Sequence, residues 1–188
     1  MKKKLISVLV CAAVSLAGCN KIKDATSRDF TVNGVEFGFT AVTTADAAIA
    51  KGATKAAGET STFSVTRTVN ISEIGDSDII EYANKISKVA VNSSTLSVTT
   101  DPSGSYIVEN LTVSAVGVSG SPLVIPSYTL GGAFTSPAGM NDFTAGFIMK
   151  LLRDKSVTVT VSGETNAPAN TEVNIIYDND LLFTASLL

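Results

Sequence analysis

The chain has 188 residues, a formal net charge of −3, two cysteines, and no histidine or tryptophan. Without histidine, the chain lacks the most common general base, the usual Ser-His-Asp arrangement and histidine-ligated metal sites. Its mild acidity argues against nucleic acid, whose binders show basic patches, and against electrostatic adhesion to an anionic membrane.

The first 18 residues have the three-part layout of a bacterial secretory signal peptide. Lysines 2–4 come first, an apolar run follows from Leu5 to Val14, and small residues come next. The apolar run is shorter than the roughly 20 residues that a transmembrane helix needs. We therefore expect a cleaved signal peptide and no transmembrane anchor.

The segment ends in Leu16-Ala17-Gly18-Cys19, which resembles the lipobox of bacterial lipoproteins. The resemblance implies that cleavage makes Cys19 the N-terminal residue, with diacylglycerol on its sulfur and usually a third acyl chain, such as palmitate, on its amine. Several acyl chains anchor a protein stably, whereas one anchors it only marginally. Cys19 is then a lipidation site, and Cys11 is lost on cleavage. The alternative is an ordinary secreted protein with a chance cysteine.

By analogy with the same family, Asn20 favours the outer membrane, because Asp at that position favours retention in the inner membrane. Residues 21–24 are not an acidic surface-export signal, so we expect a periplasm-facing protein of the cell envelope. Residues 1–18 hold three lysines and no carboxylate, so cleavage makes the chain more acidic. We predict a signal peptide at 1–18, a lipidated cysteine and tether at 19–28, and a single β-rich domain at 29–188, long enough to bury a core.

The start of this domain predicts strands around a turn. Asn33-Gly34 between apolar residues indicates a type I′ hairpin turn. We expect Thr44 to cap a short helix ending near Gly52, or this segment to form a loop. Residues 61–72 alternate as a strand in which Arg67 is the only break, and we expect Arg67 near a sheet margin. An alternating half-buried strand also covers Val35, Phe37, Phe39 and Ala41.

The middle of the chain predicts a short helix and further strands. Asp76 or Ser77 is the expected cap of a helix that buries Ile79, Ala83 and Ile86. In residues 87–100 the inward parity changes, which predicts a β-bulge near Asn92 to Ser94. A strand then buries Leu111, Val113 and Ala115, and Pro126 indicates that the short strand beside it lies at an edge.

The most regular helical pattern lies at residues 141–155. Asn141 is the expected cap, and the basic residues Lys150, Arg153 and Lys155 suit the last turn. This helix either covers a solid core or closes an apolar cavity. In the second case the cavity is lined by Phe143, Phe147, Ile148, Leu151 and Leu152.

The last two strands alternate clearly, at 156–165 and 171–187. In the second, the odd positions are apolar except Asn179, so either one long strand or a hairpin loop at Asp178-Asn179-Asp180 fits. Asp178 and Asp180 could offer oxygens to calcium, but the flanking sequence lacks the EF-hand glycine and glutamate, and we favour a turn or bulge.

The whole pattern predicts a mainly β protein: an antiparallel β-sandwich of immunoglobulin or fibronectin type with two short helices. The alternative is a curled sheet or barrel plugged by the 143–152 helix. The body resembles bacterial lipoprotein β-domains in general and no named family.

We therefore predict a non-enzymatic, membrane-anchored lipoprotein whose sandwich is structural or binds protein. The alternative is a periplasmic carrier of an apolar ligand such as a lipid, which needs a cavity of roughly several hundred Å³. A hydrolase is the third hypothesis, but no Gly-x-Ser-x-Gly or Ser-x-x-Lys motif supports it. We predict no catalytic residue, metal, cofactor or nucleic-acid partner.

Overall fold

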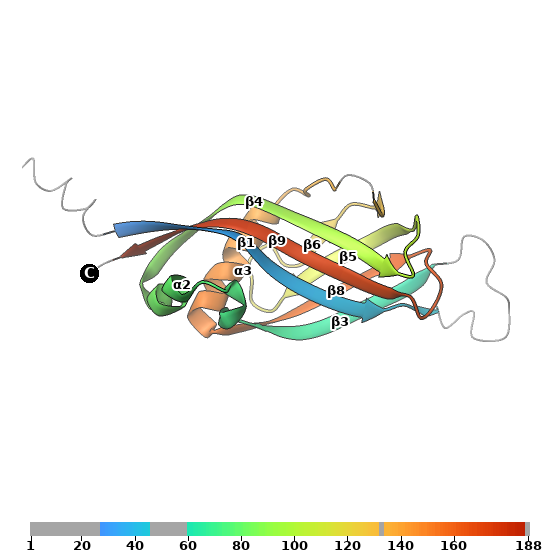
Figure 1. Ribbon diagram of the computed structural model, residues 1–188, viewed down its shortest axis with the longest axis horizontal. Helices are drawn as coiled ribbons and strands as arrows, with labels where there is room; N and C mark the ends of the chain where they lie inside the picture. Colours follow the sequence, from blue (N-terminus) through green and yellow to red (C-terminus); the bar gives the residue numbers. More distant parts are fainter. Residues whose placement is uncertain (1–26, 46–59, 132–133, 187–188) are drawn as a thin grey trace, which may run out of the picture.

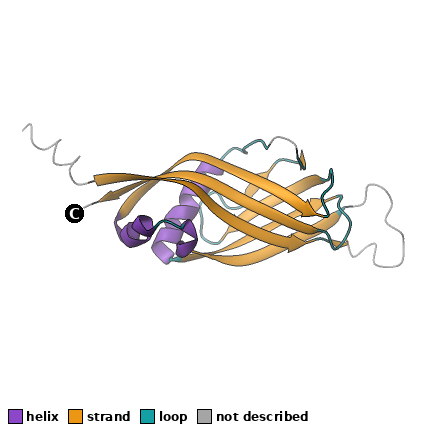
Figure 2. Cartoon of the chain, viewed as in Figure 1, coloured by secondary structure: helices purple, strands orange, loops and turns teal. Residues whose placement is uncertain are grey.

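The structure is a computed structural model that describes residues 27–45, 60–131 and 134–186. Two antiparallel sheets pack face to face, and the helices gather toward one end of them (Figures 1 and 2). The predicted signal peptide, the lipobox with Cys19, and the segment 46–59 lie outside the described residues.

The first sheet has three long strands in the order β1–β9–β4. They are β1 (Ser27–Val42), β9 (Glu172–Ser186) and β4 (Ile86–Asp101). The odd residues of β9 from Val173 to Ala185 are all buried, so the C-terminal segment is one long strand and not a hairpin.

The second sheet has the order β2–β3–β8–β5–β6, with β7 also paired to β5. The chain passes from the first sheet to the second through buried Thr43. The short strand β6 lies at an edge just before Pro126, as predicted. The strands are β2 (Thr44–Ala45), β3 (Ser61–Asn70), β5 (Ile107–Ala115), β6 (Leu123–Ile125), β7 (Tyr128–Thr129) and β8 (Ser156–Thr165).

Two α-helices and two 3₁₀ turns complete the described fold: η1 (Ile71–Ile74), α2 (Ser77–Tyr82), η2 (Ala83–Lys85) and α3 (Met140–Asp154). The predicted cap of α2 is confirmed, because the Asp76 side chain accepts a hydrogen bond from the Ile79 nitrogen at 3.0 Å. The predicted Asn141 cap of α3 is wrong. The cap is Gly139 at φ +83°, a left-handed conformation that glycine adopts without strain.

Helix α3 packs in the core between the two sheets. The Phe147 ring meets the Phe37 ring of β1 edge to face, with 5.2 Å between centroids. The predicted β-sandwich with two short helices is confirmed, and the sheets do not close into a barrel. Arg67 is only partly exposed: its guanidinium pairs with Glu73 at 2.8 Å and lies over the Phe39 ring, while its Nε is buried without a hydrogen-bond partner among the described residues.

One turn prediction in the first strand is wrong. Asn33-Gly34 forms no hairpin, because β1 runs straight through it with a register shift between Val32 and Val35. Thr44 begins the short strand β2, where it pairs with Thr62, and most of the helix or loop expected up to Gly52 lies outside the described residues. The predicted bulge in β4 is confirmed by a register shift between Val91 and Ser93.

The strand register defines two ends of the sandwich. Ser27 pairs with Ser186 at what we call the terminal end, and Val42 pairs with Glu172 at the opposite, distal end. The β1 strand connects them over 16 residues, or about 50 Å. Helix α2 lies toward the terminal end (Figure 1).

Candidate functional site

The five residues predicted to line an apolar site are all buried against the core. Phe143, Phe147, Ile148, Leu151 and Leu152 are at most 2% exposed. The void between α3 and the sheets measures about 10 Å³, and of the five only Phe143 and Phe147 line it. This is about the space of one water and far below a small-molecule site. As described, the helix is core and does not enclose a ligand cavity.

A buried polar network connects α3 to the first sheet. The Ser94 hydroxyl donates to Asn179 Oδ1 at 2.6 Å and lies 3.1 Å from the Thr144 hydroxyl. Thr144 also hydrogen-bonds the Tyr177 hydroxyl. Burial raises the pKa of Tyr177, so every member is neutral at physiological pH. Such a network can fix packing, and it offers no general base.

The two aspartates considered for calcium face outward from β9. Asp180 is occupied by the protein itself: Oδ1 accepts from the Gly34 nitrogen at 3.0 Å, and Oδ2 accepts from Ser93 Oγ at 2.8 Å. Each donor lies at the bulge of a neighbouring strand. Among the described residues, no group of three or more acidic, histidine or cysteine side chains is placed to hold a metal ion.

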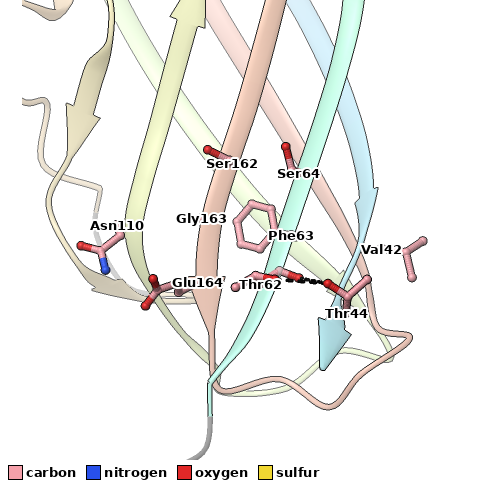
Figure 3. Close-up of a pocket in the computed structure, with 9 residues that line it drawn as sticks. All are labelled: Val42, Thr44, Thr62, Phe63, Ser64, Asn110, Ser162, Gly163 and Glu164. Carbon is pink, nitrogen blue, oxygen red and sulfur yellow. Dashed lines mark hydrogen bonds between the residues drawn. The ribbon is translucent and has the colours of Figure 1, made fainter. Parts of the chain in front are cut away.

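A groove of about 430 Å³ opens at the distal end of the second sheet (Figure 3). Thr44 and Thr62 on its margin are hydrogen-bonded to each other, at 3.2 Å between hydroxyls. Within the described part of the chain, no hydrogen bond engages the side chains of Ser64, Asn110 or Glu164. The groove is lined by Val42, Thr44, Thr62, Phe63, Ser64, Asn110, Ser162, Gly163 and Glu164.

A bulge in β5 shapes this groove. The register jumps between Glu109 and Thr112, so two residues of β5 oppose Gly163 of β8. Asn110 takes a left-handed φ of +51° at this bulge, a conformation that asparagine tolerates better than most residues. Gly163 leaves room for the Phe63 ring, since an added Cβ would lie 2.7 Å from it. The sequence analysis did not identify this groove. The one feature of the sequence that could have indicated it is the polar pair Glu109-Asn110 inside an alternating strand.

The distal end carries opposed carboxylates. Glu109 pairs directly with Glu164 across β5 and β8, and Asp101 pairs with Glu172 across β4 and β9. Like charges directly opposite each other on a sheet are destabilising. No lysine or arginine of the described segments forms an ion pair with these four carboxylates. These basic residues are Arg28, Arg67, Lys85, Lys88, Lys150, Arg153 and Lys155.

No protein-family model and no curated protein sequence matches this chain. The fold and the grooves are therefore the grounds for any functional argument. In the segments that the structure describes, no helix has the length and apolar character to cross a membrane.

Proposed function

We propose that this protein is a non-enzymatic, lipid-anchored β-sandwich module of the cell envelope that binds a partner protein at its distal groove. The anchor is Cys19, in the periplasm-facing leaflet of the outer membrane. The Leu-Ala-Gly-Cys motif behind a basic and apolar leader supports this assignment. The nearly filled core favours a contact module over a carrier of apolar ligands.

The observation that carries the proposal is the position of the distal groove relative to the chain's start. The described chain begins with Ser27 at the terminal end, only a few residues after Cys19, and the groove lies at the other end of β1. A protein held at its terminal end would present the groove away from the membrane. Ser64, Asn110 and Glu164 there have hydrogen-bonding capacity that a partner can use.

The charge of the distal end indicates the chemistry of the partner. Glu109 lies opposite Glu164 and Asp101 lies opposite Glu172, and among the described residues no lysine or arginine forms an ion pair with any of the four. A partner that brings lysine or arginine side chains relieves this repulsion on binding and gains electrostatic complementarity. We therefore infer a basic protein surface as the partner.

Site-specific photocrosslinking in living cells tests the proposal. A crosslinking residue at Ser64, in the groove, should trap a discrete partner, and adding Glu164→Lys should abolish the product. The matched control is Ser97, an equally exposed strand serine on the outer face of the other sheet. Equal products from both positions, or a product that persists with Glu164→Lys, would overturn the partner assignment. Retention of acyl chains and membrane association by Cys19→Ala would overturn the anchor.

A further inference from the structure

A second groove, of about 460 Å³, lies toward the terminal end between α3, η2 and the turn after β5. Its only charged lining residues are Lys150 and Arg153. The Lys150 side chain crosses the groove to the turn, because a Cβ added to Gly117 would lie 3.2 Å from its Nζ. The remaining lining residues are Ala83, Asn84, Ile86, Gly117, Ser119, Gly146, Met149 and Leu152.

A row of alternating cations and aromatic rings lies at the same end. The Arg28 guanidinium sits 4.8 Å from the Phe30 ring centroid, and the Phe30 ring stacks on Tyr82 at 5.8 Å. The Lys85 ammonium lies 5.9 Å from the Tyr82 ring. Aromatic rings beside lysine and arginine are the side chains that membrane interfaces favour, because one part is apolar and the other remains hydrated.

Two exposed apolar side chains lie in segments that directly precede lining residues of this groove. Val116, in the turn after β5, is 69% exposed, and Ile80 on α2 is 38% exposed. The Val116 nitrogen bonds the Thr158 carbonyl near the start of β8, which places this turn at the terminal end. Basic groups and apolar tips therefore occur together there.

Carboxylates are also present at this end, but they leave the groove positive. Asp154 is shared by Lys150 at 2.6 Å and Arg153 at 2.7 Å, so one carboxylate faces two cations. Glu73 is paired with Arg67. Asp78 and Glu81 belong to α2 and Asp76 caps it, and none of the three lines the groove.

We propose that the terminal end docks on the membrane that holds the anchor, with Lys150 and Arg153 contacting the phosphates of anionic phospholipid headgroups. The docking rests on the proposed lipid anchor. Residues 20–26 between Cys19 and β1 can span at most about 25 Å, so the start of β1, at the same end of the sandwich as the groove, stays within about that distance of the anchor. The net negative charge of the whole chain disfavours adhesion to an anionic membrane. Electrostatic interactions are screened beyond about 8 Å, however, so the charge of the docking surface itself determines whether it binds.

Fluorescence quenching by doxyl-labelled lipids tests the docking on the full acylated protein in phosphatidylcholine vesicles, with and without phosphatidylglycerol. Mature protein with acylated Cys19 has no other thiol, so a probe can be attached at Ser119→Cys in the groove or at Ser103→Cys in the distal turn. We expect several-fold stronger quenching at position 119, dependent on phosphatidylglycerol and lost in Lys150→Gln/Arg153→Gln. The control Lys51→Gln/Lys55→Gln removes the same charge and should leave the quenching intact.

Equal quenching at positions 119 and 103 would overturn the docking. Quenching at position 119 that does not depend on phosphatidylglycerol, or that persists in Lys150→Gln/Arg153→Gln, would overturn it as well. Failure of the anchor is detected separately, as a mature chain without acyl mass. In that case a Cys19→Ser chain with the probe at position 119 is measured with excess vesicles. Quenching that needs phosphatidylglycerol then supports the docking surface by itself, and its absence refutes it.

Discussion

Asp180 accepts a hydrogen bond from the backbone nitrogen of Gly34, 146 residues earlier in the chain, at 3.0 Å. Its second oxygen accepts from Ser93 of β4 at 2.8 Å. One carboxylate in the middle strand thus holds a bulge in each neighbouring strand. On the buried side the adjacent residue Asn179 does the same: its amide donates to Val35 O at 3.2 Å, and its oxygen accepts from Ser94.

Asp180→Ala should lower the free energy of unfolding by about 1 to 2 kcal/mol, because it removes two hydrogen bonds to a charged group. Asp178→Ala is the matched control on the same face of the same strand. Asp178 lies opposite Glu36, and its removal should be neutral or stabilising. Urea unfolding measures both, and equal destabilisation would contradict the role of Asp180.

Gly34→Ala should destabilise the protein by about 1 to 2 kcal/mol, since Gly34 has φ +68° and a Cβ is strained there. Gly38→Ala, four residues along the same strand, meets no atom within 4 Å and has no such φ. It should be neutral or stabilising, because alanine restricts the unfolded chain. Thermal unfolding compares the two, and a similar loss in both would show that the bulge conformation does not matter.

Asn179→Ala should be more costly than either change above, at about 3 kcal/mol, because it removes the buried hydrogen bonds that the Asn179 side chain makes to Ser94 and to the Val35 carbonyl. Asn174→Ala serves as control: Asn174 lies on the outer face of β9 and bonds Thr40. Its loss should stay within about 1 kcal/mol, because water can replace that partner. Chemical denaturation of both variants checks the order.

Phe147→Ala should lower stability by about 3 to 5 kcal/mol, because it opens a cavity in a packed core. Met149→Ala, on the half-buried side of the same helix, should have a smaller effect. The Phe147 variant should also bind small apolar molecules such as xenon, whereas the native protein should not. Binding of such probes by the native protein would contradict the filled core.

The hydrogen bond from Arg153, and then that from Lys150, lowers the pKa of Asp154 to about 2. A depressed carboxyl pKa stabilises the folded state above the unfolded pKa, near 3.8, and this contribution is lost as the pH falls toward 2. NMR titration should show a larger rise in the pKa of Asp154 for Arg153→Ala than for Lys150→Gln. The reverse order would show that Lys150 is the main partner.

Local alternation predicted most of the strands and their buried faces. The parity change between Val91 and Leu96 located the bulge in β4, because a single extra residue moves every later side chain to the other face. The same signal was present around Asn33-Gly34, where partly buried Val32 and buried Val35 differ in parity. Asn-Gly suits both a hairpin turn and a bulge, and only the pairing of β1 with the uninterrupted strand β9 distinguishes the two.

By itself, the sequence determined the mainly β fold, the two helices and the side of each that is buried, since these follow from spacing along a few residues. The tertiary structure decided which carboxylates oppose each other, where Asp180 finds its donors, and that space remains at the two ends of the sandwich while almost none remains beneath α3. These features join residues far apart in the chain. They depend on strand register and on how side chains from five elements fill a common volume, and neither quantity is encoded in a local pattern.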